Sequence, residues 1–139
     1  MIVLDTSGLL AAIDGSQRQH PAAVAAVRRA RAPLLLSPFV LAELGYLLST
    51  RVSAAASAAL LRQVASGVYR LEPMSADDVA RAAEVIERYR DVDLGLADAS
   101  LVVLAERHGT LDLLTLDERH FRAVRGPGDR PFRILPADG

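Results

Sequence analysis

The feature that most constrains this chain is its opening stretch, in which a short apolar run ends at an acid. Ile2–Leu4 is a continuous apolar run that fits a strand buried on both faces. Asp5 ends the run with a charge, and Thr6 and Ser7 suit the cap of a following helix. We therefore expect Asp5 at the carboxyl end of a central strand, where open α/β sheets bind ligands. A second interpretation, in which Asp5 only caps the helix, stays open at this point.

Length and composition predict one folded domain. The chain has 139 residues, of which 51% are hydrophobic, so general disorder is excluded and a core can be buried. There is no cysteine, which excludes a disulfide framework and a thiolate metal site. The start of the chain lacks a basic leader, and the apolar region 34–48 is too interrupted to cross a membrane. We expect a cytoplasmic protein without a membrane segment.

The charge of the chain says little about its binding partners. The net charge is −1, so the chain as a whole has no electrostatic attraction for nucleic acid. All sixteen basic residues are arginine, and each offers a planar fork that suits phosphate or carboxylate. Base composition of the source genome is an equally simple reason for this bias.

Strand and helix patterns alternate along the chain, which predicts βα units and a parallel sheet. Buried strands are expected at 34–36 and 111–116, and shorter strands at 69–72 and 132–135. The expected helices cover residues 21–31, 38–48, 52–67, 76–90 and 96–108.

Three further acids stand in apolar surroundings. Glu43 lies in the middle of a helix on which no other residue looks solvated, and an ionised carboxylate there is costly without a partner. Asp98 lies near the amino end of an apolar helix. Asp117 directly follows the strand expected at 111–116, which repeats the opening pattern. Solvent exposure of Glu43 and helix capping by Asp98 remain alternatives.

These four acids favour a metal site. Converging carboxylates repel one another and raise their own pKa values unless a cation is present. Ligation by oxygen alone is what Mg²⁺ or Mn²⁺ prefers, and a carboxylate-held metal can activate water and stabilise phosphoryl charge. If the acids converge, the chemistry they favour is metal-dependent phosphoryl transfer to water.

Other acidic sites fit the opening stretch less well. A phosphatase of the haloacid-dehalogenase type needs a second Asp where this chain has Ser7, and a receiver domain needs a catalytic lysine. The metal-ion adhesion motif needs a second Ser where Leu9 stands. No glycine pattern of a P-loop or of a dinucleotide site occurs.

Four segments carry a resemblance that covers nearly the whole chain. They are Val3-Leu4-Asp5-Thr6-Ser7, Ser37-Pro38-Phe39-Val40-Leu41-Ala42-Glu43, Leu96-Ala97-Asp98-Ala99-Ser100 and Leu114-Thr115-Leu116-Asp117-Glu118-Arg119-His120-Phe121. In this order they resemble the motifs of PIN-domain ribonucleases of the VapC toxin type. By this resemblance the acidic quartet is Asp5, Glu43, Asp98 and Asp117, with Thr6 and Ser7 in support. Asp5 and Asp98 would be the most direct metal ligands.

The resemblance implies a single PIN-like domain over residues 1–139. The implied fold is a three-layer α/β/α sandwich with a short central parallel sheet. The implied activity is that of a Mg²⁺-dependent endoribonuclease, with Mn²⁺ as an alternative ion, which acts as the toxin of a VapBC-type pair. The implied partners are RNA, a VapB-type antitoxin and a second copy of the chain in a homodimer.

Two questions stay open at the level of sequence. Leu47, Leu48, Leu60 and Leu61 could form a partner-binding surface, or could simply pack on one another. The leading alternative function is a catalytically silent PIN-fold module that binds protein or RNA. A small-molecule phosphatase is a third and less favoured hypothesis.

Overall fold

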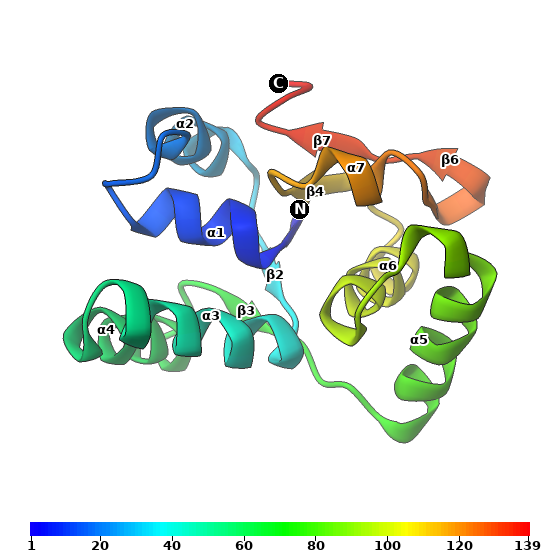
Figure 1. Cartoon of the computed structure of the whole chain (residues 1–139), viewed down its shortest axis with the longest axis horizontal. Coiled ribbons are helices and arrows are strands. Elements are labelled where there is room, and N and C mark those ends of the chain that lie inside the picture. The colour runs from blue at the N-terminus through cyan, green and yellow to red at the C-terminus, as the bar shows by residue number, and fades with distance from the viewer.

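The computed structural model describes all 139 residues, and at its centre is a five-stranded parallel sheet (Figure 1). The strand order is β3-β2-β1-β4-β7, so the opening strand occupies the middle. Register places Leu4 beside Leu36 on one side and Leu114 on the other. The strands are β1 (Ile2–Leu4), β2 (Leu34–Leu36), β3 (Arg70–Leu71), β4 (Asp112–Leu114) and β7 (Arg133–Leu135). The predicted α/β/α fold with a short parallel sheet is confirmed.

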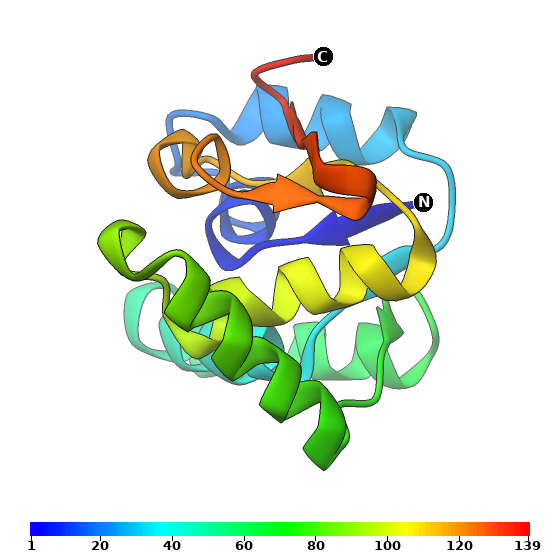
Figure 2. The ribbon, with the colours of Figure 1, turned by 90° about the vertical axis from the view of Figure 1, so that its right-hand side faces the viewer.

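Helices cover both faces of this sheet. In Figure 1, α1 and α2 lie to its left and α5 and α6 to its right, and Figure 2 shows α5 and α6 in front of it. α3 contacts both α1 and α6. The helices are α1 (Thr6–Ile13), α2 (His20–Arg29), α3 (Pro38–Arg51), α4 (Ala54–Ala65), α5 (Ala76–Arg88), α6 (Leu96–His108) and α7 (Glu118–Phe121). A small antiparallel hairpin, β5 (Arg125–Gly126) and β6 (Arg130–Pro131), flanks the turn η2 (Pro127–Asp129), and a second short turn, η1 (Arg90–Val92), precedes α6.

Helix ends form where local chemistry favours them. The Ser37 hydroxyl accepts the N–H of Phe39 and caps α3 directly before a proline. Ser75 and Asp78 form a reciprocal capping box at the start of α5. Gly109 ends α6 at a φ of 66°, a left-handed conformation that costs glycine little. These contacts fix where each helix begins or ends relative to the sheet.

The core is built from aliphatic strands and from α6, whose residues from Ala99 to Ala105 are all buried. Close packing also requires Gly8 at the start of α1. A Cβ atom at Gly8 would lie 2.5 Å from the backbone oxygen of Leu114. The absence of a side chain therefore lets the first turn of α1 rest directly on the end of β4.

The four leucines that were candidates for a partner surface mostly belong to the core. Leu48 and Leu60 are fully buried and Leu47 packs partly against the core, whereas Leu61 is exposed. The second interpretation, in which these leucines pack on one another, is therefore the better one. No helix of the chain is both long enough and apolar enough to cross a membrane.

Candidate active site

Asp5 lies at the carboxyl end of the central strand, as the sequence predicts, and is held from several sides. The residue is only 5% exposed. Oδ1 accepts the Thr6 N–H at 2.8 Å, which is the helix-capping contact. Oδ2 accepts hydrogen bonds from the hydroxyls of Ser7 at 3.1 Å and Thr115 at 2.6 Å. Asp5 therefore caps α1 and also belongs to a hydrogen-bonded cluster at the edge of the sheet.

Backbone contacts determine the direction of the two hydroxyl hydrogen bonds. The Ser7 Oγ accepts the N–H of Leu116 at 3.0 Å, and the Thr115 Oγ1 accepts the N–H of Asp117 at 2.9 Å. Each hydroxyl has only one hydrogen, and each is left free to donate it to Asp5. The carboxylate is thus fixed in position by two hydroxyl donors, which also lie 3.2 Å from each other.

Asp98 lies in the first turn of α6, where it caps the helix and also interacts with other acids. Its Oδ2 accepts the N–H of Gly95 at 3.1 Å, so it caps the helix. Burial raises the pKa of Asp98, and the charges of Asp117 and Glu43 add to the rise against the lowering effects of the Gly95 hydrogen bond and of His120. Capping therefore does not exclude a place in the acidic site.

Asp5 and Asp98 also interact electrostatically. Burial raises the pKa of the Asp5 carboxyl to about 6, although the hydrogen bond from Thr115 opposes the rise. The charge of Asp98 raises it further. The charge of Asp98 acts on Asp5, and the charges of Asp117 and Glu43 act on Asp98, so the structure places the other three predicted acids around Asp98.

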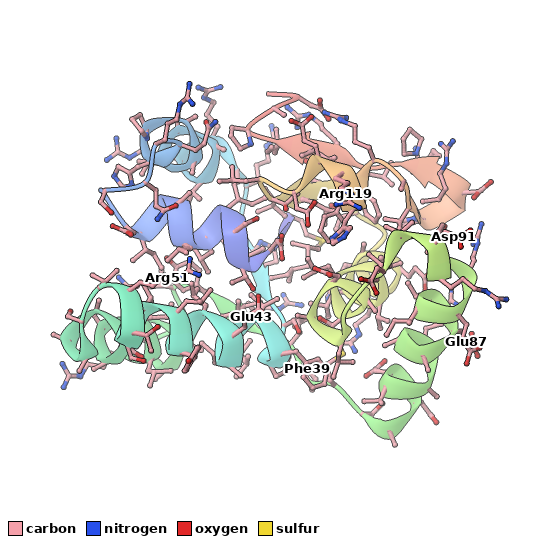
Figure 3. All side chains as sticks on the ribbon, in the orientation of Figure 1. Phe39, Glu43, Arg51, Glu87, Asp91 and Arg119 are labelled. Atoms are coloured by element: carbon pink, nitrogen blue, oxygen red, sulfur yellow. The ribbon has the colours of Figure 1, made fainter.

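Glu43 reaches this site from α3, but its surroundings differ from the expectation. The residue is exposed, and so are its helical neighbours Tyr46, Ser49 and Thr50. The premise that nothing else on this helix is solvated is therefore wrong. Figure 3 shows Glu43 on the side of α3 that faces α1. Its position beside the site, rather than burial, relates it to Asp98.

Asp117 does not repeat the position of Asp5. Strand β4 ends at Leu114, earlier than expected, so Thr115 takes the first position after the strand. Asp117 lies further on and caps α7, because its Oδ1 accepts the N–H of His120 at 3.0 Å. Its charge nevertheless acts on Asp98.

His120 belongs to the site although the sequence analysis gave it no role. Its Nδ1 lies 2.7 Å from Asp117 Oδ2 and 3.8 Å from Asp98 Oδ2. The contact with Asp117 is close but is not aligned as a hydrogen bond. The signal in the sequence was its place three residues after Asp117, since the first turn of a capped helix brings such a side chain back beside the cap.

A pair of buried serines joins the helices that carry Glu43 and Asp98. The Ser100 hydroxyl donates to the carbonyl of Ala97 at 2.6 Å, so at 2.7 Å it accepts the hydrogen of Ser37. Both serines are completely buried. This bond joins the amino end of α3 to the amino-terminal part of α6. The helices that carry Glu43 and Asp98 are therefore held next to each other.

Two buried side-chain atoms lack a hydrogen-bond partner in this chain, and both lie at this site. They are Thr6 Oγ1, next to Asp5, and His120 Nδ1, between Asp98 and Asp117. Buried polar atoms are rarely left unpaired, so their clustering at one place indicates a site that receives a ligand. Excess carboxylate oxygens with raised pKa values fit a hard divalent cation. As the side chains are arranged, no three acidic or histidine groups converge on one point.

Comparisons with known proteins show the family to which this chain belongs. Residues 2–127 match the PIN domain family. Ribonuclease VapC26 of Mycobacterium tuberculosis is 41% identical over 135 residues, which cover 97% of this chain and 100% of that protein. The crystal structure of VapC20 from the same organism, described as a sarcin-ricin loop cleaving toxin, has a TM-score of 0.79 at 25% identity and covers 84% of this chain and 90% of its own. FitAcB from Neisseria gonorrhoeae, with a TM-score of 0.66 at 20% identity over 88% and 92% of the two chains, shares the fold.

Proposed function

Because this chain belongs to the PIN-domain family and is an endoribonuclease of the VapC toxin type, we propose that Asp5, Glu43, Asp98 and Asp117 form its active site. The observation that carries this proposal is the position of Asp98, whose carboxylate shares the His120 ring with Asp117 and whose charge interacts with those of Asp5, Glu43 and Asp117. We further propose that residues 1–139 act as one PIN-like domain.

The cofactor we propose is Mg²⁺, with Mn²⁺ as an alternative. Asp5 and Asp98 would hold the ion most directly, and Glu43 and Asp117 would hold it or its waters. When bound, such an ion lowers the pKa of a bound water and stabilises charge on phosphoryl oxygens. The donor set supports this choice, because every candidate ligand in the quartet is a carboxylate oxygen.

The remaining residues of the site position these acids. Ser7 and Thr115 hold the Asp5 carboxylate in one orientation, and the Ser37–Ser100 bond keeps α3 beside α6. The Thr6 hydroxyl is buried beside Asp5 and makes no hydrogen bond within the chain. Such preorganisation keeps the reacting groups in place without reorganisation during the reaction.

The proposed partners follow from the family. We propose an RNA substrate, a VapB-type antitoxin that blocks the acidic site, and a homodimer. A catalytically silent module that binds RNA or protein is the second candidate, and the lack of three ready ligands around one point is the observation that favours it.

Cleavage of a cellular RNA pool separates these two functions. The purified chain would be incubated with the pool in Mg²⁺, in Mn²⁺ and with chelator, beside Asp98→Asn and the matched control Asp93→Asn. Asp93 is an exposed loop acid with a φ of 61°, a conformation that asparagine adopts readily.

We expect discrete fragments that require the metal. Asp98→Asn should slow cleavage by about 100-fold or more, since a metal site supplies several kcal/mol to the transition state. Asp93→Asn should cleave like the wild type. Equal cleavage by Asp98→Asn would overturn the site, whereas no cleavage and no metal binding by the wild type would favour the silent module.

A further inference from the structure

Aromatic side chains are scarce in this chain, and their distribution is uneven. The sequence has three phenylalanines, three tyrosines and no tryptophan. Four of these rings are used by the core or packed against it: Tyr69, Tyr89, Phe121 and Phe132. The two that remain, Phe39 and Tyr46, both belong to α3 and neither packs against the core.

Both of these rings are accessible. The Tyr46 side chain is 68% exposed, and its hydroxyl makes no hydrogen bond within the chain. Phe39 is half-buried, at the amino end of the same helix. The buried face of α3 consists instead of Val40, Leu44 and Leu48. Folding therefore does not explain why two aromatic residues stand on the opposite side of this helix.

Helix geometry places the two rings on either side of Glu43. Phe39 precedes this acid by four residues and Tyr46 follows it by three, which are the spacings of neighbours on one helix face. At a rise of about 1.5 Å per residue, the two aromatic positions are separated by roughly 10 Å along the axis. Figure 3 shows Phe39 and Glu43 on adjacent turns of α3.

We propose that Phe39 and Tyr46 are stacking platforms for two bases of a single-stranded RNA, so that the backbone between these bases passes Glu43. This inference rests on the proposed function and adds how the substrate is held. Unpaired bases are commonly recognised by stacking on aromatic side chains, and stacking tolerates any base because every base has a π face. The stripe thus fits an RNA strand whose target phosphate lies between the two stacked bases.

Two arginines supply the positive charge that such a strand needs next to four acids. Arg51, at the end of α3, and Arg119, on α7, are exposed and neither forms an ion pair. Six of the sixteen arginines are paired with carboxylates, so Arg51 and Arg119 belong to ten that are not, and their place beside Glu43 distinguishes them. In Figure 3, Arg51 and Arg119 are on opposite sides of Glu43. They are placed to contact phosphates that precede and follow the stacked bases.

The test uses RNA 9-mers of two kinds and a readout specific for stacking. One is an adenosine 9-mer with a central 2-aminopurine, and the other has the same length but abasic riboses. Binding would be measured by fluorescence anisotropy in the Asp98→Asn chain, so that the RNA stays intact. The variants are Phe39→Leu and Tyr46→Leu, with Tyr46→Phe as the ring-retaining control and Val79→Ala as a control for lost exposed apolar surface on α5.

Loss of one stacked base should weaken binding of the adenosine 9-mer about 5- to 30-fold in each leucine variant. Binding of the abasic 9-mer should not change, and quenching of the 2-aminopurine should be lost. Tyr46→Phe and Val79→Ala should behave like the parent chain. Cleavage of the RNA pool by Phe39→Leu with an intact Asp98 should fall by a similar factor.

Three outcomes would overturn the inference. The first is unchanged binding of the adenosine 9-mer, or no binding of it by the parent chain. The second is an equal loss for both 9-mers, which would assign the effect to folding. The third is unchanged RNA binding with loss of self-association or antitoxin binding, which would make this face a protein interface. Because binding does not require cleavage, failure of the proposed function would be seen separately in the RNA pool.

Discussion

Thr115 Oγ1 donates a 2.6 Å hydrogen bond to Asp5 Oδ2, although 110 positions separate the two residues in the sequence. The contact exists because β1 and β4 are parallel neighbours whose carboxyl ends meet at one edge of the sheet. The same hydroxyl accepts the N–H of Asp117, so one side chain links two acids of the proposed site.

Replacing Thr115 with valine should damage this link. Thr115→Val removes a donor from Asp5 and leaves the N–H of Asp117 without an acceptor. We expect RNA cleavage to fall by about 10- to 100-fold, as for other groups that orient metal ligands. The free energy of unfolding should fall by about 1–3 kcal/mol. Thr115→Ser keeps the hydroxyl and should have nearly the cleavage rate and the unfolding free energy of the wild type. Full activity of Thr115→Val would show that the hydroxyl is not needed to hold the two acids.

The raised pKa of Asp5 predicts a pH dependence of stability in the metal-free protein. The carboxyl titrates near 3.8 when unfolded and near 6 when folded, so the folded state resists ionisation. The free energy of unfolding should therefore fall as pH rises from 4 to 7, by up to about 3 kcal/mol from this group. Asp5→Asn lacks the effect. In urea unfolding with chelator, the unfolding free energy of Asp5→Asn should increase relative to that of the wild type as pH rises. A difference between the two proteins that does not change with pH would contradict this.

Gly8 should tolerate no side chain. In Gly8→Ala the new Cβ would overlap the backbone oxygen of Leu114, so α1 must move away from β4. We expect a loss of about 2 kcal/mol or more in unfolding free energy, together with lower cleavage, because Asp5 directly precedes α1. Gly15→Ala is the matched control, since a Cβ there meets nothing within 4 Å. Equal stability of the two variants would show that the close approach is unimportant.

Glu72 is the centre of an ionic cluster, away from the proposed site, that contributes to stability. This buried carboxylate contacts His108 Nε2, Arg70 Nε at 3.2 Å and Arg107 Nη1 at 3.7 Å. Burial tends to raise the pKa of Glu72, but the hydrogen bonds from His108 and Arg70 outweigh it and lower the pKa.

Glu72→Gln should therefore lower the unfolding free energy by about 3 kcal/mol at pH 7, because partner charges lose their acceptor. The contribution of this ionised group is complete above its unfolded pKa near 4.5 and is lost as pH falls through the lower folded value. Chemical denaturation should show a smaller difference in unfolding free energy between the wild type and Glu72→Gln at pH 3.5 than at pH 7. The exposed Glu84, which pairs with Arg81, provides the control Glu84→Gln, with an expected cost of about 0.5 kcal/mol or less.

The sheet and most helix boundaries could be predicted from local patterns. The apolar runs of β1, β2 and β4 and caps such as Ser37 and Gly109 are features of neighbouring residues. The end of β4 could not be predicted, since the apolar run continues to Leu116. The Thr115 N–H still bonds the carbonyl of Leu135 in β7, but its side chain bonds to Asp5, a long-range contact that the local pattern does not contain.

Only part of the site could be predicted, because some of its contacts also join residues that are distant in the sequence. The acids could be selected from their contexts, but α3 is apolar on most of its surface, so its exposed face was not visible in the pattern. The favoured interpretation set Glu43 in apolar surroundings, whereas the alternative, an exposed Glu43, is what the structure shows. A role for His120 could not be predicted, because it depends on the contact with Asp98, which lies on a helix distant in the sequence.

Titration of Mn²⁺ into the protein is the most direct test of the central claim, that the four acids form a divalent-metal site. The wild type, Asp98→Asn and Asp93→Asn would be compared by calorimetry at pH 7. We expect the wild type and Asp93→Asn to bind Mn²⁺ with equal affinity and Asp98→Asn to bind it about tenfold more weakly or worse. Equal affinity in Asp98→Asn, or no binding by the wild type, would show that these acids do not form the metal site.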